Sequence, residues 1–195
     1  MSRNFFQDYL NRLAYSYLKA CPKILDVGCG SGEFVKLNRR KIIGMDSNRV
    51  TVNQCRRDKL KAVYGQATKL PFASGSFSGL NCSHVIEHLY PSEVYRFLAE
   101  AGRVLKPGGI LVISSPLFWP GFYNNLSHIK PYPPAALLRY LTEAAPDTTF
   151  PRLKHRFKEL ALIWRFRPFL SYRLYPLGIY SPFKDGYMLV LKKIR

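Results

Sequence analysis

The stretch KILDVGCGSGE, residues 23–33, is followed by KIIGMDSN, residues 41–48. In each stretch a short apolar run leads to a carboxylate, Asp26 in the first and Asp46 in the second. The first run is followed by glycines at alternate positions, Gly28, Gly30 and Gly32. Short apolar runs bounded by turn residues are typical of buried strands, and glycine lets a ligand lie against the main chain because it has no Cβ. The stretch therefore predicts a buried strand that leads into a ligand-binding loop.

Similar apolar runs alternate with helical patterns along the rest of the chain. Strands are expected at residues 23–27, 42–45, 62–64, 77–82 and 110–114, and helices at residues 4–19, 32–37, 50–57, 91–105 and 134–143. Residues 186–192 predict a final strand, with residues 148–156 as its antiparallel neighbour. This alternation favours a parallel sheet with helices on both faces. We expect an α/β fold, a Rossmann-like, doubly wound, mostly parallel seven-stranded sheet with an antiparallel C-terminal strand, in three αβα layers.

The chain length of 195 residues fits one domain with one sizeable core. Within a single domain over residues 1–195, residues 1–20 are expected to form an N-terminal helix. Residues 116–185 are expected to form a substrate-side loop and helical insertion, because they begin with a stretch rich in proline and aromatic residues.

Composition narrows the class of protein. At 47% hydrophobic and 22% charged residues the chain resembles a globular protein rather than a disordered one. Its four cysteines form no CxxC pair and no metal-finger spacing, which favours a reduced, cytoplasmic protein. No apolar run reaches the length of about 18 residues that a membrane span needs, and the first residues lack a signal-peptide pattern.

The net charge of +18 is unevenly distributed. Residues 1–61 hold 13 basic and 5 acidic side chains, and residues 152–195 hold 11 and 2, whereas residues 62–151 hold 6 and 5. A positive field of this size attracts nucleic acid, anionic lipid or an acidic small molecule. The alternative is a solvated basic surface with no specific partner.

The glycines lie where ligands bind in open parallel sheets, outside the carboxyl ends of the strands. Their spacing is GxGxG, whereas a dinucleotide site more often has GxGxxG. Asp46 ends the second expected strand, where a carboxylate can accept hydrogen bonds from both ribose hydroxyls. The combination indicates a ligand that contains a nucleoside.

Four segments resemble, in order, successive motifs of the class I S-adenosylmethionine-dependent methyltransferases. They are DVGCGSGE (26–33), GMDSN (44–48), KLPFASGSFSGLNCSHVIEHL (69–89) and RVLKPGGILVISSP (103–116). The resemblance covers residues 22–116 and is strongest to the small-molecule branch that includes the ubiquinone and menaquinone enzymes. It implies a methyltransferase that uses S-adenosyl-L-methionine as its cofactor.

The resemblance also implies which residues bind the cofactor: Asp26, Gly28, Cys29, Gly30, Gly32, Asp46, Ser47, Gln66, Ala67, Cys82 and Ser83. The glycines would line the methionine part, Asp26 would support their loop, and Asp46 would hold the ribose. Gln66 stands where the family usually has an aspartate that accepts a hydrogen bond from the adenine amine. Its carbonyl oxygen is also an acceptor, so cofactor binding is still expected.

Two histidines are the candidate catalytic residues. Methyl transfer is an in-line displacement in which the protein mainly aligns the reactants, and a base is needed only if the acceptor must lose a proton. His88 follows the fourth expected strand, and His128 lies in the loop after the fifth. A structural role in shaping the loops is the alternative for each of them.

No metal site is expected. His84, Glu87 and His88 have the HxxEH spacing of a zinc-protease pattern, but that chemistry needs the histidines on one helix face. Some quinone methyltransferases hold a divalent ion with acids and a histidine at this point. Glu87 and His88 match two of those positions, but His84 replaces an acid.

The acceptor is expected to be a small molecule or a lipid-linked compound. The segment after the fourth strand reads SHVIEH and lacks the Asn/Asp-Pro-Pro-Tyr/Phe motif of enzymes that methylate base amines. Residues 154–173 mix basic with aromatic side chains, which suits peripheral contact with an anionic membrane. A helix that covers one sheet edge is the alternative for this segment. An RNA methyltransferase, or a non-catalytic binding protein with this fold, stays open as a further function.

Overall fold

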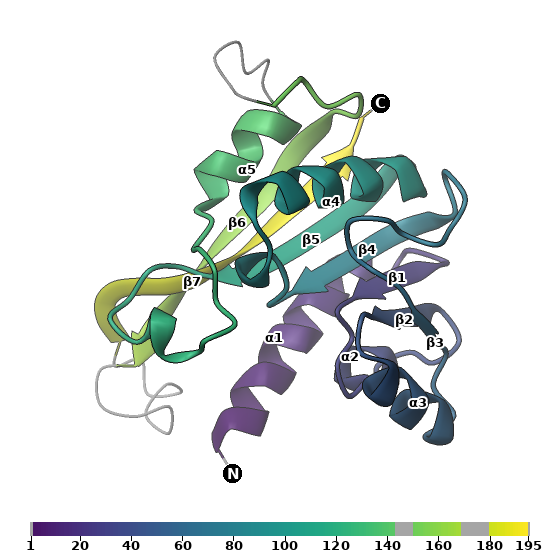
Figure 1. The fold of residues 1–195 in the computed structure, drawn as a ribbon, viewed down its shortest axis with the longest axis horizontal. Helices are drawn as coiled ribbons and strands as arrows, with labels where there is room; N and C mark the ends of the chain where they lie inside the picture. The colour runs from purple at the N-terminus through teal and green to yellow at the C-terminus, as the bar shows by residue number, and fades with distance from the viewer. Residues whose placement is uncertain (1, 143–149, 169–179, 195) are drawn as a thin grey trace.

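The computed structural model describes residues 2–142, 150–168 and 180–194. They form a seven-stranded sheet with the strand order β3-β2-β1-β4-β5-β7-β6 (Figure 1). The strands are β1 (Ile24–Val27), β2 (Ile42–Asp46), β3 (Ala62–Tyr64), β4 (Phe77–Ser83), β5 (Leu105–Pro116), β6 (Phe157–Pro168) and β7 (Tyr180–Lys193). Strands β1 to β5 pair in parallel, and β7 and β6 add to the sheet in antiparallel fashion. The expected fold class is confirmed.

Helices cover both faces of this sheet, which gives the three αβα layers. The α-helices are α1 (Ser2–Leu18), α2 (Glu33–Lys36), α3 (Arg49–Arg57), α4 (Pro91–Val104) and α5 (Pro134–Leu141), and two short 3₁₀ helices are η1 (Ile86–His88) and η2 (Phe122–Asn124). Buried side chains of α1, α2 and α3 share one core cluster with one face of the sheet. Those of α4 and α5 share a second cluster with the other face.

The sheet register brings the carboxyl ends of the parallel strands to one edge. Asp26 of β1 aligns with Gly44 of β2 on one side and with Asn81 of β4 on the other. From β1 the chain runs outward through β2 to β3 and then returns to β4 on the opposite side of β1. The strand order therefore reverses between β1 and β4, which is the point at which open α/β sheets bind ligands.

The loop between β3 and β4 contains no helix and is tied to α4. Glu100 accepts a hydrogen bond from the Leu70 amide at 2.8 Å. Arg103 donates to the carbonyl oxygens of Leu70 and Phe72 at 3.0 and 2.7 Å. These bonds position the segment that carries Gln66 and Ala67.

The C-terminal part differs from the expectation in two respects, the neighbour of β7 and the structure of residues 157–168. The antiparallel neighbour of β7 is Phe157–Pro168 and not residues 148–156. The helix considered for residues 154–173 is therefore wrong for residues 157–168, and residues 169–173 lie outside the described part. The reason is a period of two in this segment. Leu162 and Trp164 pack against one core cluster, and Ala161 and Ile163 pack against the other.

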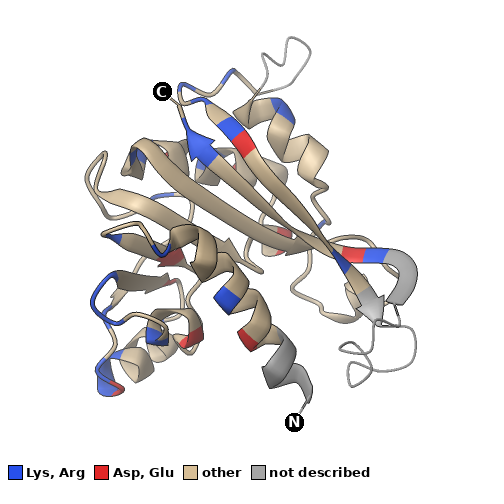
Figure 2. Ribbon diagram, turned by 180° about the vertical axis from the view of Figure 1, so that it is seen from behind, with Lys and Arg blue, Asp and Glu red and all other residues tan. Residues whose placement is uncertain are grey.

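The charged side chains follow the same order of strands. Figure 2 shows Lys and Arg on α3 and its neighbouring loops and again on β6 and β7. Because β2 and β3 lie at one edge of the sheet and β6 and β7 at the other, the two groups are separated by the width of the sheet. In the part of the chain that the structure covers, no helix is long and apolar enough to cross a membrane.

Candidate active site

The residues expected to bind the cofactor all lie in β1 to β4 or directly after them. Asp26 and the three glycines belong to β1 and its loop, Asp46 and Ser47 to the end of β2, Gln66 and Ala67 to the loop after β3, and Cys82 and Ser83 to the end of β4. Since these strands are parallel and adjacent, their carboxyl ends share one edge of the sheet. The structure therefore brings the whole expected set to one edge.

The loop after β1 offers bare main chain at this edge. Gly28 and Gly30 have φ angles of 73° and 49°, in the left-handed region that favours glycine. A Cβ on Gly28 would clash with Cγ2 of Val85, so a larger residue does not fit there. A Cβ on Gly30 would meet no atom within 4 Å. The main chain at Gly30 thus faces open space, which is the condition for a ligand to lie against it.

Asp46 is fixed beside this open main chain. Its Oδ2 accepts a hydrogen bond from the Gly30 amide at 3.0 Å, and its Oδ1 accepts one from the Asn48 amide at 2.8 Å. The residue is half-buried at the end of β2. A carboxylate offers about four lone-pair sites, so each oxygen can accept a further bond from a ribose hydroxyl.

Asp26 lies deeper, below the glycine loop. Its Oδ1 accepts a hydrogen bond from Nδ2 of Asn81 at 2.8 Å, across the β1–β4 pairing. Burial raises the pKa of Asp26 to about 7, the hydrogen bond from Asn81 opposes the rise, and the charge of Asp46 adds to it. Oδ1 of Asn81 is buried and has no hydrogen-bond partner among the described residues. A protonated Asp26 would offer a donor in this pair.

The cysteines of the site are buried, and the Cys55 thiol donates a hydrogen bond to the Gly30 carbonyl oxygen at 3.3 Å. Burial raises the pKa of the Cys29, Cys55 and Cys82 thiols. The Cys29 amide donates to the Met45 carbonyl at 3.0 Å, and its carbonyl accepts from the Gly32 amide at 2.8 Å. These bonds fix the main chain of Cys29 within the loop, and its role in cofactor binding stays a prediction.

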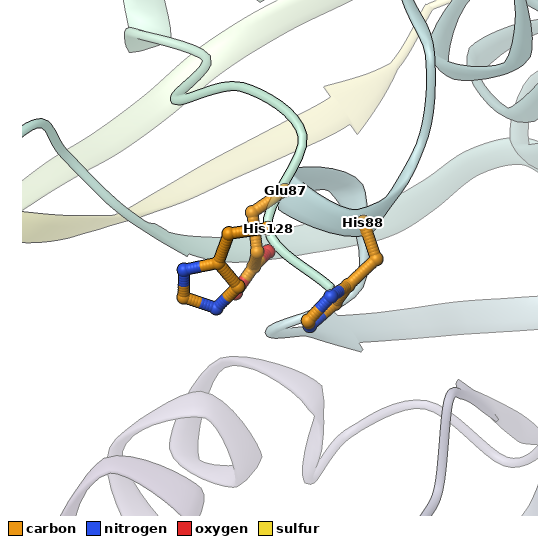
Figure 3. A group of neighbouring side chains, drawn as sticks. All are labelled: Glu87, His88 and His128. Carbon is orange, nitrogen blue, oxygen red and sulfur yellow. The ribbon is translucent and has the colours of Figure 1, made fainter. Parts of the chain in front are cut away.

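The two candidate catalytic histidines lie together, one in the segment after β4 and the other in the loop after β5. The ring centroids of His88 and His128 are 4.9 Å apart, although the two residues belong to different loops. Figure 3 shows both rings beside the carboxylate of Glu87. One ligand atom from each of these three side chains lies within 4.8 Å of the others. The sequence places the two histidines in different loops and does not predict that their rings lie side by side.

Backbone hydrogen bonds hold the two loops against each other. The Glu87 carbonyl accepts from the Ile129 amide at 2.8 Å. Nδ1 of His128 lies 2.7 Å from the Phe122 carbonyl oxygen, and Nδ1 of His88 lies 3.0 Å from the Ser127 carbonyl oxygen. A carbonyl has no hydrogen to give, so each Nδ1 is the donor. In each neutral ring the lone pair is therefore on Nε2.

Glu87 is fully buried and held by a polar network. Its Oε1 lies 3.0 Å from Nδ1 of His84, and its Oε2 accepts from the Ser115 hydroxyl at 3.3 Å. Burial alone would raise the pKa of Glu87, but the hydrogen bond and charge of His84, together with a backbone hydrogen bond and the charge of His88, lower it. His84 has a φ of 56°, an uncommon conformation for a residue other than glycine. Such strain occurs often at functional sites.

The network continues into the antiparallel strands. Nη1 of Arg165 lies 3.3 Å from Nε2 of His84, and Nε of Arg165 donates to Asp185 at 2.8 Å. Arg165 and Asp185 could not be predicted as site residues from the sequence, because their link to His84 depends on the pairing of β6 with β7.

A small cavity of about 100 Å³ opens next to this network. Its lining is mainly apolar and aromatic and comes from α1, β5, β6 and β7: Tyr9, Leu10, Leu13, Ser114, Ile163, Trp164, Arg165, Tyr187 and Met188. One lining residue, Ser114 of β5, aligns with Ser83 at the end of β4 in the sheet register. This lining was also missed, because it combines residues that are far apart in the sequence.

Comparisons with known proteins agree with this site. A protein-family model described as a methyltransferase domain matches residues 25–113. A sterol 24-C-methyltransferase of Gibberella zeae is 37% identical over 106 residues, which are 48% of this chain and 27% of that protein. A tRNA (carboxymethyluridine(34)-5-O)-methyltransferase of Mus musculus is 33% identical over 102 residues, which are 50% of this chain and 15% of that protein.

A solved structure supports the fold over most of the chain. The crystal structure of a SAM-dependent methyltransferase from Archaeoglobus fulgidus matches with a TM-score of 0.69 and 24% identity, covering 96% of this chain and 93% of that one. The chain spans only 15% to 51% of the lengths of the first three curated relatives that it matches.

Residues 25–113, which match the methyltransferase domain family, contain the glycine loop and Asp46. The matched family and the solved structures described as SAM-dependent methyltransferases support S-adenosyl-L-methionine as the cofactor. The narrower resemblance to the ubiquinone and menaquinone enzymes stays a prediction.

Proposed function

We propose that the protein transfers the methyl group of S-adenosylmethionine to a small-molecule or lipid-linked acceptor. The observation that carries this proposal is the open main chain at Gly30 with the Asp46 carboxylate fixed 3.0 Å from its amide. The methionine part of the cofactor would lie along the glycines, and Asp46 would bind the ribose hydroxyls. Gln66 and Ala67 would flank the adenine.

His88 and His128 are the proposed catalytic residues. When bound, S-adenosylmethionine would supply an activated methyl group, and its transfer to an acceptor atom would leave S-adenosylhomocysteine as the product. An acceptor hydroxyl would give its proton to an Nε2 lone pair, since both Nδ1 atoms are already donors. Glu87 would act through the position of the loop that carries His128.

Two features support a small or lipid-linked acceptor. The cavity beside Ser114 is small and lined mainly by apolar and aromatic side chains. One relative carries a lipid substrate in its name, the sterol 24-C-methyltransferase. We also propose peripheral contact with anionic membrane through the basic C-terminal part.

An RNA methyltransferase is the second candidate, because the chain is strongly basic and a tRNA methyltransferase is among its relatives. The two functions differ in where the methyl group goes. The test uses S-adenosylmethionine with a tritiated methyl group, the purified protein and a cell extract separated into lipids, small polar molecules and RNA. We expect label in the lipid or small-molecule fraction. Label confined to RNA would contradict the proposal.

An inactive variant is needed to show that the label depends on this site. Asp46→Ala should lower the labelling, whereas Asp58→Ala, which removes an exposed acid at the end of α3, should leave it unchanged. Binding of S-adenosylhomocysteine, measured by calorimetry, separates loss of cofactor from loss of acceptor. No heat with either S-adenosylmethionine or S-adenosylhomocysteine would favour a non-catalytic binding protein.

A further inference from the structure

Glu87, His88 and His128 have the composition of a metal site. One ligand atom from each of these three side chains lies within 4.8 Å of the other two, so together they could hold a metal ion. Figure 3 shows the carboxylate and both imidazole rings on the same side of η1. Two histidines and one carboxylate are a common ligand set of zinc enzymes and of non-haem iron enzymes.

Both histidines are already in the tautomer that a metal requires. A metal-bound imidazole usually donates its second ring N–H to a carbonyl or a carboxylate, which fixes the ring and leaves the other nitrogen free. His128 donates from Nδ1 to the Phe122 carbonyl at 2.7 Å, and His88 donates from Nδ1 to the Ser127 carbonyl at 3.0 Å. The Nε2 lone pairs of both rings are therefore free for a ligand.

The third group is held in a similar way. The Glu87 carboxylate is fully buried, and its oxygens are bonded to His84 and Ser115. His84 is itself fixed by Arg165, which lies 3.3 Å from its other ring nitrogen. These contacts orient the carboxylate as outer-shell partners orient a metal ligand. They also keep it from rotating away from the two histidines.

The distances require only a small contraction. With metal–ligand distances of about 2.1 Å, two ligand atoms can be at most about 4.2 Å apart. Because the Glu87 carboxylate is held in place, the two imidazole rings would supply most of the contraction, with displacements of their ligand atoms on the order of 1 Å. The Ile129 amide already binds the Glu87 carbonyl, so the loop of His128 lies beside Glu87 before any metal binds.

We propose that Glu87, His88 and His128 bind one divalent transition-metal ion, with zinc as the expected ion. The nitrogen-rich set disfavours magnesium and calcium, which prefer oxygen ligands. Three protein ligands leave at least one coordination position open, as in catalytic zinc sites. The proposal concerns binding alone and does not depend on the proposed methyl transfer.

One consequence does rest on the proposed function. An acceptor hydroxyl at the open position would lose its proton more readily, because a bound metal stabilises the oxyanion. The two histidines would then orient the acceptor through the metal instead of accepting its proton. The metal site was not expected from the sequence, because the local pattern groups Glu87 and His88 with His84, which holds Glu87. The third proposed ligand, His128, lies in a separate loop.

The experiment is calorimetric titration of zinc chloride into the full chain after a chelator has been removed by dialysis. Any histidine affinity tag is cleaved first, because it would bind zinc itself. We expect about one zinc ion per chain. His128→Ala and Glu87→Gln should each weaken binding by at least about tenfold, since each removes one of three ligands. His155→Ala is the matched control and should leave the affinity unchanged, because His155 is the one histidine of the chain outside this region.

Two results would overturn the proposal: no zinc binding at millimolar zinc, or binding that His155→Ala weakens as much as His128→Ala does. Circular dichroism shows whether the variant with the buried substitution Glu87→Gln folds. If that variant does not fold, the test of zinc binding rests on His128→Ala, which changes a half-buried residue. Visible absorption of the cobalt form is a second readout of the coordination. Titration of S-adenosylhomocysteine into the same samples tests cofactor binding separately, so either function can fail without the other.

Discussion

At the scale of single residues, Asp46 has the most specific expected role. Asp46→Ala should weaken S-adenosylhomocysteine binding by about 2 kcal/mol, which is roughly thirtyfold, because it removes charge-assisted hydrogen bonds to the ribose. Isothermal titration calorimetry measures this change. Asp58→Ala removes an exposed acid and serves as the control. Equal affinities for wild type and Asp46→Ala would exclude Asp46 from the site.

Asp26 predicts a dependence of stability on pH. Burial raises the pKa of Asp26 to about 7 in the folded protein, whereas the unfolded chain should have a value of about 3.9. Between these values the folded state binds more protons, so the free energy of unfolding falls as the pH rises. The stabilising effect is complete below pH 4 and is lost as the pH rises through 7.

Asp26→Asn should remove this dependence. An asparagine keeps an acceptor for Asn81 and adds a donor for the unpartnered Asn81 oxygen. Relative to wild type, the variant should gain on the order of 2 kcal/mol of unfolding free energy between pH 5 and pH 8. Urea denaturation at both pH values measures the difference. A constant difference would mean that Asp26 does not titrate in this range.

Some of these residues could be predicted from the sequence, and others could not. Gly28, Gly30 and Asp46 could, because a short apolar run, a glycine loop and a strand-end acid are local patterns. Asn81 could be paired with Asp26 only after the register of β1 and β4 was known. The contact of His88 with His128 depends on the path of an irregular, proline-rich loop, which no periodicity describes.

At the scale of elements, the glycine loop is fitted to the turn after β4. A Cβ on Gly28 would clash with Val85 and would also adopt a positive φ. Gly28→Ala should therefore destabilise the protein by about 2–3 kcal/mol, from about 1 kcal/mol of strain and the rest from overpacking. In a Val85→Ala background only the strain should remain. Thermal and urea denaturation of the four proteins in this double-mutant cycle measure the coupling.

Gly75→Ala is the matched control for that cycle. Gly75 also has a positive φ, of 63°, but a Cβ there would meet no atom within 4 Å. Its substitution should cost about 1 kcal/mol in either background. If Gly28→Ala costs the same with and without Val85, the two elements are not in the close contact described above.

The link between β6, β7 and the turn after β4 predicts a second element-scale effect. Arg165 and Asp185 form an ion pair whose side chains are only 15% and 9% exposed. Arg165→Met should cost about 3 kcal/mol, because it leaves a buried carboxylate without its partner. Adding Asp185→Asn should restore part of the loss. The exposed pair of Arg12 and Asp8 is the control, and Arg12→Met should cost less than about 1 kcal/mol.

The strand β6 shows why element type was harder to predict at this end of the chain. Its basic and aromatic residues do not alternate in a simple way, and the pairing has register shifts between Glu159 and Ala161 and again after Arg165. A bulge interrupts the two-residue period that identifies a strand. The strands β1 and β2 lack this problem, because they are short, mainly apolar and bounded by glycine or charged residues.

At the scale of the whole molecule, the net charge of +18 predicts binding to anionic surfaces. The proposed membrane contact assigns this binding to the C-terminal part, at the β6–β7 edge of the sheet. The protein should cosediment with vesicles that contain phosphatidylglycerol, and not with pure phosphatidylcholine vesicles. Binding should weaken as salt rises from 50 to 300 mM, because exposed charges are screened.

Two charge-matched variants test which edge is responsible. The first double variant, Lys154→Gln with Lys158→Gln, removes two exposed charges at the start of β6. The second, Arg39→Gln with Arg40→Gln, removes two exposed charges just before β2. At about 1 kcal/mol for each basic residue close to the surface, the first pair should weaken vesicle binding roughly thirtyfold and the second pair should not. Equal losses would indicate a non-specific basic surface, since the two pairs change the net charge by the same amount. A loss confined to the first pair would assign the contact with anionic membrane to the β6–β7 edge of the sheet, and both variants keep every residue of the candidate active site.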